Sequence, residues 1–370
     1  MTIPSLSSSS VIDLVAPGSS VTVDQIQESV KQVEALGFKA RLQVRPVNLQ
    51  VSDTASFIKP AITSEKFQFL KKALTVSDSE AVWCIRGGYG SQKLMPYLLR
   101  MKQPQKPKIF IGYSDVTVIQ LFLAQKWKWP SLHFPVLVHV KDSSSAALRR
   151  FKALLTGIQK QQSFSGLKLL NPECVSQKQG SIKNKKDHFS QSLDQTGIKK
   201  KTTKEIQIHS YLVGGNLSLI QSSIGTPWMS FFKNKILFLE DIREAPYRLD
   251  RALWQMWKAG VFQGVKALVL GDFIPSRSGN YLLRTLSARG KKLIETTKLK
   301  QGQSNYRSKN FDWEVKQVFR AFSRRVSFPV LAGVPCGHGS KKEALPFLTP
   351  CSLKIPVEGK TSLNITSPFI

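Results

Sequence analysis

Two apolar segments of this chain each end in a loop of small residues that leads into a helical pattern. Residues 81–85 are followed by the loop RGGYGS at residues 86–91, and residues 108–111 by GYSD at residues 112–115. Short apolar runs bounded by glycine are typical of buried strands. A repeated strand–loop–helix order indicates a parallel sheet, because parallel strands need a crossover between them. In such sheets ligands bind at the edge where the strands end.

The rest of the chain continues this alternation. Residues 11–15 form an apolar run that leads through a turn into a helix. Thr22 and Gln25 have the spacing of a capping box at the start of this helix, and Gly37 closes it. Further helices are predicted at residues 65–74, 116–125 and 248–259, and further strands at 236–239, 265–270 and 328–331.

Two polar segments interrupt the pattern. Residues 156–206 are interpreted as a linker with a lysine-rich insertion, and residues about 276–325 as a second, basic insertion. Such segments have few residues able to join a core. The sequence therefore predicts an N-terminal domain at residues 1–155, then the linker, and a C-terminal domain at residues 207–370.

The net charge of the chain is +30, and its pI is about 10.1. A surplus of this size can indicate binding to nucleic acid. However, no aromatic interleaving, RNP-like motif or zinc finger accompanies the charge. A solvated, lysine-rich loop is the favoured interpretation, and no specific nucleic-acid partner is expected.

The composition also bears on the compartment. No run approaches the roughly 18 apolar residues that a membrane span needs, and residues 1–10 lack the basic start of a signal peptide. The four cysteines are scattered without CxxC spacing, which suits a reducing compartment and argues against a zinc ribbon. A cytoplasmic protein without a membrane span is expected.

Ser114 directly follows a predicted strand, in a turn that should expose its hydroxyl. A nucleophilic serine needs a base, an orienting acid and backbone N–H groups that face the developing oxyanion. The amides of Asp115 and Gly88 could be these donors. The turn is not the GxSxG elbow of α/β-hydrolases, because Val116 occupies the last glycine position. The alternative is that Ser114 only caps the following helix.

Two other residues could complete such a site. His338 lies between two glycines, where an imidazole packs poorly but is well exposed. Glu240 follows an apolar strand, so its carboxylate should emerge at the sheet edge; alternatively it stabilises a helix N-terminus. His133 and His139 are interpreted as satisfied core histidines. No metal site is expected, because the chain has no HExxH motif, no histidine pair at i,i+4 spacing and no cysteine cluster.

Seven short motifs occur in a fixed order that is far more specific than any one of them. They are APGS (16–19), RGGYG (86–90), GYSD (112–115), GGNLS (214–218), LED (239–241), APYRLDR (245–251) and GHG (337–339). Together they closely resemble the LD-carboxypeptidase family of serine peptidases, which includes the microcin-immunity peptidases. The resemblance runs from about residue 11 to 355, apart from the two insertions.

This resemblance implies roles for three residues and a fold. The serine of the GYSD turn is the nucleophile, hence Ser114; the glutamate of LED is the acid, hence Glu240; the histidine of GHG is the base, hence His338. The implied fold is an N-terminal α/β domain with a parallel sheet, joined to a smaller, β-rich C-terminal α/β domain. Because Ser114 lies in the first domain and its partners lie in the second, the active site is expected in the interdomain cleft.

The resemblance also implies an activity. A serine carboxypeptidase of this type releases the terminal D-alanine of a murein tetrapeptide, without metal or cofactor, and recycles cell-wall peptides in the cytoplasm. Such proteins are typically homodimers. The first alternative is a microcin-immunity peptidase, which cleaves peptidyl or acyl-sulfamoyl adenylates with the same residues. An alternative of another class is a non-catalytic basic binding protein, against which the intact triad argues.

The chain departs from the family at three positions where glycine is usual. These are Phe134, Arg243 and Leu348. None belongs to the implied triad, and Phe134 and Arg243 are expected to line the cleft.

Overall fold

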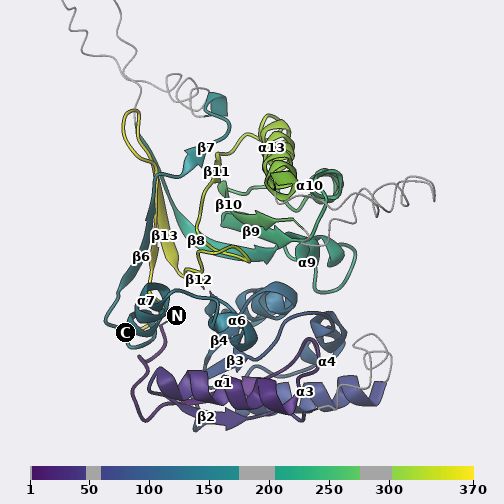
Figure 1. Cartoon of the computed structure of the whole chain (residues 1–370), viewed down its shortest axis with the longest axis vertical. Coiled ribbons are helices and arrows are strands. Elements are labelled where there is room, and N and C mark those ends of the chain that lie inside the picture. Colours follow the sequence, from purple (N-terminus) through teal and green to yellow (C-terminus); the bar gives the residue numbers. More distant parts are fainter. Residues whose placement is uncertain (1, 47–59, 175–204, 276–301) are drawn as a thin grey trace, which may run out of the picture.

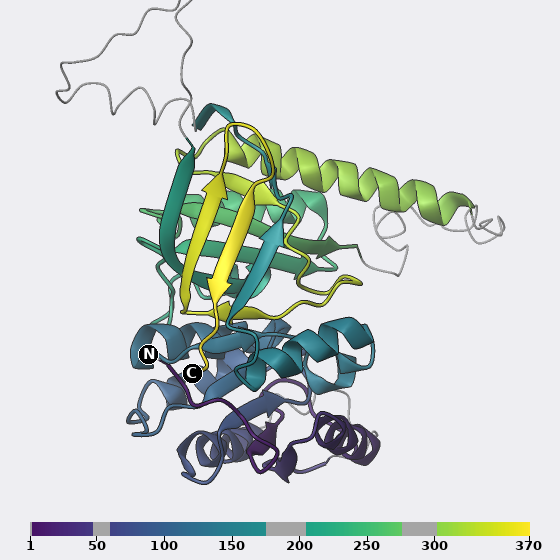
Figure 2. The same ribbon diagram turned by 90° about the vertical axis from the view of Figure 1, so that its left-hand side faces the viewer.

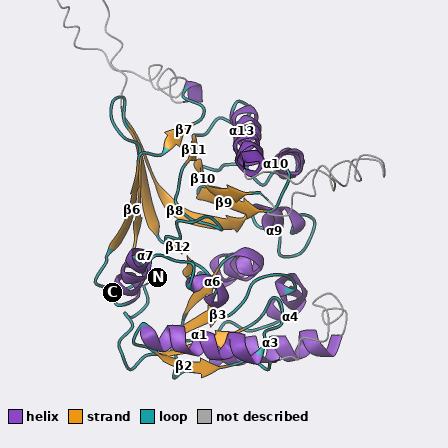
Figure 3. Ribbon diagram, in the orientation of Figure 1, coloured by secondary structure: helices purple, strands orange, loops and turns teal. Residues whose placement is uncertain are grey.

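The chain folds into two β-sheets, each covered by helices and stacked one above the other along the long axis (Figure 1). The computed structural model describes residues 2–46, 60–174, 205–275 and 302–370. Figure 3 shows the same arrangement by secondary structure, with helices packed against both sheets. A two-part α/β fold with one parallel-rich sheet, as predicted, is therefore confirmed.

The first sheet contains the strands that the sequence predicted near the N-terminus. Its order is β12-β5-β4-β3-β1-β2. The strands are β1 (Val11–Val15), β2 (Lys39–Leu42), β3 (Ala81–Cys84), β4 (Ile109–Gly112), β5 (Ser131–His133) and β12 (Leu345–Phe347). β1 to β5 pair in parallel, whereas β12 runs antiparallel to β5.

The pairing of β12 crosses the predicted domain boundary. The sequence assigned all of residues 207–370 to the C-terminal domain, but β12 completes the N-terminal sheet. Without it, β5 would present an open edge to solvent. The two parts of the chain are therefore joined through a shared sheet as well as through the linker.

Helices cover both faces of the first sheet. They are α1 (Val23–Ala35), α3 (Pro60–Thr75), α4 (Met95–Leu98), α5 (Thr117–Phe122), α6 (Leu137–Val140) and α7 (Ser145–Leu155). The predicted capping box of α1 is confirmed, because Thr22 and Gln25 each accept a hydrogen bond from the other's backbone N–H. The helix predicted at residues 116–125 is composite: a 3₁₀ turn, η2 (Ser114–Val116), precedes α5, and a π-helical turn, η3 (Leu123–Trp127), follows it.

The second sheet has eight strands in the order β6-β14-β13-β8-β9-β10-β11-β7. They are β6 (Gln161–Ser165), β7 (Lys168–Leu169), β8 (Ile206–Asn216), β9 (Ile236–Ile242), β10 (Ala267–Ile274), β11 (Val330–Ala332), β13 (Pro350–Ile355) and β14 (Ser362–Thr366). β8 to β11 are parallel, and β6, β14 and β13 extend the sheet as the antiparallel ribbon that faces the viewer in Figure 2.

This second sheet corrects two boundaries of the sequence interpretation. The segment interpreted as a linker contributes β6 and β7 to the second sheet. The segment interpreted as a second insertion ends in the helix α13 (Gly302–Ser323), whose Val315, Phe319 and Phe322 are buried in the core. Residues 175–204 and 276–301 of the two predicted insertions lie outside the described residues.

Two more helices, α9 (Leu217–Ser222) and α10 (Pro246–Lys258), cover the second sheet beside α13. α10 buries Leu249, Leu253 and Met256 at helical spacing, as its predicted amphipathic pattern requires. Within the described ranges, no helix has both the length and the apolarity to cross a bilayer.

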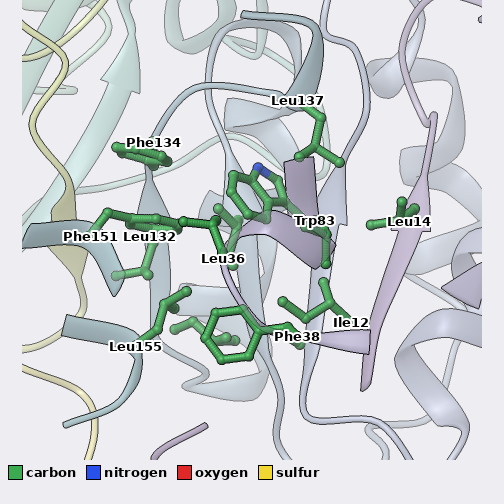
Figure 4. Packing of buried hydrophobic residues seen from close by; sticks show 14 of the residues in the cluster. Ile12, Leu14, Leu36, Phe38, Trp83, Leu132, Phe134, Leu137, Phe151 and Leu155 are labelled. Carbon is green, nitrogen blue, oxygen red and sulfur yellow. The ribbon is translucent and has the colours of Figure 1, made fainter. Parts of the chain in front are cut away.

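Phe134, one of the departures from the family pattern, lies in the core and does not line a cleft as expected. It is fully buried, stacks on Phe151 with 3.8 Å between ring centroids, and contacts Trp83 (Figure 4). Arg243 and Leu348 adopt left-handed backbone conformations, with φ of 69° and 57°. Glycine adopts such a conformation without strain, which is a physical reason for the usual residue at both positions.

Candidate active site

Ser114 occupies a strained turn between β4 and η2. Its φ of 64° lies in the left-handed region, which a residue with a Cβ adopts only when its surroundings impose it. Strand β4 ends at Gly112, Tyr113 is extended, and the 3₁₀ turn begins at Ser114 itself. The serine therefore sits at a sharp strand-to-helix corner, as the sequence predicted. It does not cap the helix, because Tyr113 is the N-cap of η2 and no side-chain cap bond forms.

A glycine loop from the neighbouring strand β3 lies against this serine. A Cβ placed on Gly87 would come within 3.3 Å of Ser114 Cβ and 3.4 Å of its Oγ. The next residue, Gly88, has a φ of 90° and packs directly against Ser19. Side chains at these positions would push the loop away, so glycine allows the close approach.

Asp115 holds the same glycine loop in place through a hydrogen bond. Its side chain is buried and accepts a hydrogen bond of 2.9 Å from the N–H of Ser91. Burial raises the pKa of this carboxyl, although the bonds from Ser91 and the Gly90 backbone oppose the rise. Gly88 and Asp115, the two predicted oxyanion donors, thus belong to elements that meet at Ser114; their donor role stays a prediction.

His338 and Glu240 form a direct pair. The distance from His338 Nδ1 to Glu240 Oε2 is 2.7 Å, and Glu240 is fully buried. The carboxylate had been expected to emerge at the sheet edge, but Glu240 lies inside β9. It is enclosed because the loop at Gly337 packs on it: a Cβ on Gly337 would lie 3.0 Å from Glu240 Oε2.

The pair shifts the pKa of both residues in opposite directions. Burial alone would raise the pKa of Glu240, but the attraction of His338 and the hydrogen bond outweigh it, so this pKa lies below its ordinary value. Burial alone would lower the pKa of His338, and Glu240 reverses this and raises it. Since Nδ1 is engaged by Glu240, the other ring nitrogen, Nε2, is the one available to exchange a proton.

Tyr113 stacks on His338 and was missed by the sequence interpretation. Its ring stacks on His338 with 4.4 Å between centroids, and its hydroxyl pairs with His139 Nδ1 at 2.7 Å. Tyr113 immediately precedes Ser114, so the stack places the His338 loop beside the serine's turn. The available signal was an aromatic residue adjacent to the candidate nucleophile.

Asn216 also belongs to this centre and was missed. Its side-chain amide donates to Asp241 at 2.9 Å and to Glu240 at 3.4 Å, while its backbone N–H donates to Thr117 Oγ1 at 3.1 Å. It therefore links Glu240 and Asp241 in one part of the chain to the helix that follows Ser114 in the other. The signal was a polar side chain directly after Gly214 and Gly215, within the GGNLS motif.

The two remaining candidate histidines behave differently. His139 pairs with the Tyr113 hydroxyl, but it is exposed and so is not the core histidine that the sequence interpretation expected. His133 is buried among Tyr113, Phe238 and Phe347, but neither of its ring nitrogens has a hydrogen-bond partner among the described residues. Burial lowers its pKa to about 4, so it is neutral. In the same described part of the chain, no group of three His, Cys, Asp or Glu residues is arranged to hold a metal.

Sequence comparison matches both halves of this site to one family. The model of the LD-carboxypeptidase N-terminal domain matches residues 12–134, and that of the C-terminal domain matches residues 209–353. The chain belongs to the LD-carboxypeptidase family. The N-terminal match includes Ser114, and the C-terminal match includes Glu240 and His338.

Individual LD-carboxypeptidase relatives extend this match. A protein of Rickettsia conorii named as a carboxypeptidase is 34% identical over 238 residues, which cover 62% of this chain and 66% of that protein. A second one, of Rickettsia prowazekii, is 35% identical, and the alignment covers 57% of its length. The alignments thus span less than two thirds of these two relatives. The murein tetrapeptide carboxypeptidase of Pseudomonas aeruginosa is 25% identical over 91% of this chain and 90% of its own.

Solved structures share the LD-carboxypeptidase fold. The muramoyltetrapeptide carboxypeptidase of Oxalobacter formigenes superposes with a TM-score of 0.64 at 23% identity, covering 96% of this chain and 99% of that one. A protein of Bacillus anthracis described as similar to the microcin self-immunity protein reaches a TM-score of 0.67 at 20% identity, over 99% of both chains. At these identities the likeness concerns the fold.

Proposed function

We propose that this protein is a serine carboxypeptidase that releases the terminal D-alanine from murein tetrapeptides. The observation that carries the proposal is the buried Glu240–His338 pair, which Tyr113 stacks beside Ser114. The Pseudomonas murein tetrapeptide carboxypeptidase, which aligns with nearly the whole chain, supports the choice of substrate.

The proposed reaction has two steps of acyl transfer. Ser114 Oγ attacks the carbonyl carbon before D-alanine, and its proton passes to His338 Nε2. Glu240 stabilises the imidazolium through Nδ1, while the amides of Gly88 and Asp115 stabilise the oxyanion. The C–N bond then breaks, and His338 protonates the departing amine. In the second step His338 takes a proton from water, the hydroxide attacks the acyl-enzyme, and Ser114 leaves with the proton.

The test is direct. Purified protein is incubated with a murein tetrapeptide, and mass spectrometry follows the loss of alanine. A tetrapeptide ending in L-alanine is the matched control and should remain intact. Cleavage of both peptides, or of neither, would contradict the proposal.

The second candidate is a peptidase of the microcin-immunity type. The microcin C7 self-immunity protein of Escherichia coli is 22% identical, but its alignment covers only 69% of this chain. An acyl-sulfamoyl adenosine serves as the discriminating substrate. If it is hydrolysed while the tetrapeptide is not, this candidate replaces the first.

We further propose, on the family resemblance, that the enzyme acts in the cytoplasm as a homodimer and without a metal. Light scattering coupled to gel filtration measures the assembly state. Fractionation of the producing cells locates the protein.

A further inference from the structure

Asp272 lies at an irregularity of β10 directly opposite the acid of the site. β10 pairs with β9 through Leu270 and again through Phe273, so Gly271 and Asp272 together face the single residue Glu240. This is a β-bulge, a feature that redirects side chains beside active sites. Here it directs Asp272 toward the loop that carries His338.

Asp272 holds that loop on both sides of the histidine. Its backbone N–H donates to the carbonyl of Cys336 at 2.9 Å, and its carboxylate Oδ2 accepts from the N–H of Gly339 at 3.1 Å. One residue thus bonds to positions 336 and 339, between which His338 lies. These two bonds fix both the position of the loop relative to β10 and its orientation.

The two glycines that flank His338 are shaped around the same side chain. A Cβ on Gly337 would lie 3.3 Å from Asp272 Cβ, and one on Gly339 would collide with its carboxylate. Gly337 also has a φ of 127°, which disfavours other residues. The GHG sequence is therefore the pattern needed for a loop pressed onto Asp272 and Glu240.

We propose that Asp272 is a positioning residue that holds the His338 loop in the position and orientation from which the imidazole exchanges a proton with Ser114. This inference rests on the proposed function, in which His338 is the base. Asp272 acts through the loop and does not contact the reacting atoms. Glu240 orients the ring within its plane, and Asp272 fixes the backbone from which the ring projects.

The carboxylate has a second, electrostatic effect on the base. Burial raises the pKa of Asp272 to about 6, whereas the Gly339 bond and the charge of His338 favour ionisation. Near pH 7 Asp272 is therefore mostly ionised and stabilises the imidazolium of His338. Removing this charge lowers the pKa of His338, which gives the proposal a signature that general structural damage does not produce.

Two substitutions separate the parts of this role. Asp272→Ala removes the acceptor for Gly339 and should lower kcat by about 10- to 100-fold, because small misplacements of a catalytic group cost up to ~10²-fold; KM should stay within about threefold. Asp272→Asn keeps an acceptor oxygen and should recover most of kcat. Its acid limb in kcat/KM should move to lower pH, because the charge is gone.

The matched control is Asp312→Asn, which removes an exposed carboxylate of α13 that lines a pocket together with Asp272. Asp312→Asn should keep the wild-type kcat and pH profile. Wild-type kcat and pH dependence in Asp272→Ala would overturn the proposal. So would a loss in Asp272→Ala that appears only in KM, since that would indicate contact with substrate.

Two measurements do not depend on the tetrapeptide. NMR titration of the His338 ring should give a lower pKa in Asp272→Asn than in wild type, and an unchanged value would refute the electrostatic part. The rate at which a fluorophosphonate labels Ser114 should fall in Asp272→Ala and recover in Asp272→Asn. If wild type labels but does not cleave the tetrapeptide, the proposed substrate is wrong while the role of Asp272 is still decided.

Discussion

The ring of Tyr113 lies flat against the imidazole of His338, with 23° between the two planes. Tyr113 directly follows strand β4 of the N-terminal sheet, and His338 belongs to a loop more than two hundred positions later in the chain. The contact therefore fixes the position of the His338 loop relative to the turn that carries Ser114. Its hydroxyl bond to His139 holds the phenol ring in this orientation.

Substitution of Tyr113 should separate stacking from hydrogen bonding. Tyr113→Leu loses the stack, worth about 0.5–1.5 kcal/mol, and should lower kcat by up to roughly 10-fold. Tyr113→Phe keeps the stack, so kcat should stay within about threefold; because His139 is exposed, water can replace the lost bond, and the free energy of unfolding should fall by no more than about 1 kcal/mol. Steady-state kinetics and urea unfolding check the two effects, and equal kcat in both variants would contradict the role of the stack.

Ser114→Ala should abolish hydrolysis while preserving the fold. Loss of a serine nucleophile typically costs about 10⁴-fold or more in rate. Alanine retains a Cβ in the strained turn, so the free energy of unfolding should remain close to that of wild type. Ser163→Ala, on the exposed face of β6, is the control. Turnover near the wild-type rate in Ser114→Ala would remove Ser114 from the mechanism.

Glu240→Gln should lower kcat by about 10³- to 10⁴-fold with little change in KM. The amide matches the carboxylate in shape, but it no longer stabilises the imidazolium and can favour the wrong tautomer of His338. Circular dichroism verifies the fold. An activity within tenfold of wild type would show that another residue orients the base.

The acid limb of the pH profile should reflect His338. Because Glu240 raises the pKa of His338 above its ordinary 6.5, protonation begins at a higher pH than for a free histidine. The base must be neutral, so activity is full above this pKa and is lost as pH falls through it. We expect kcat/KM, measured between about pH 5 and 9, to have an acidic midpoint above 6.5. A flat profile would exclude His338 as the base.

Thr117→Val should weaken the junction between the two parts of the chain. The buried hydroxyl of Thr117 accepts from the backbone N–H of Asn216, and valine leaves that N–H unpaired. The cost is about 1–3 kcal/mol in the free energy of unfolding, measured in urea. Thr117→Ser retains the acceptor and should behave nearly as wild type. Equal stability of all three proteins would show that the bond contributes nothing.

Local patterns predicted much of this fold because the relevant interactions are local. β1, β3 and β4 are apolar runs closed by loops, and α1 has its capping box. α13 was overlooked because its buried Val315, Phe319 and Phe322 lie in a polar, basic stretch. β12 was not predicted, since three residues that contain a proline form a strand only through pairing with distant β5.

The candidate site was predicted through the order of its motifs and not through geometry. Spacing alone could not bring Glu240 and His338 within 2.7 Å, because nearly a hundred residues separate them. Tyr113 and Asp272 escaped notice for the same reason. Each acts on a loop that only the tertiary fold places nearby. The burial of Glu240 was also unexpected, since it depends on the bulge and the glycine loop above it.

The placement of β12 has a consequence for how the enzyme comes into being. During synthesis, β1 to β5 emerge from the ribosome long before β12. Until β12 follows, the edge of β5 is unpaired and can pair with other chains. β12 follows shortly after His338 in the sequence. The segment that seals the nascent sheet therefore arrives only a few residues after His338, the proposed base. A chain that stops before His338 has neither a closed sheet nor the residue that we propose activates Ser114, so we expect such a chain to be hydrolytically silent.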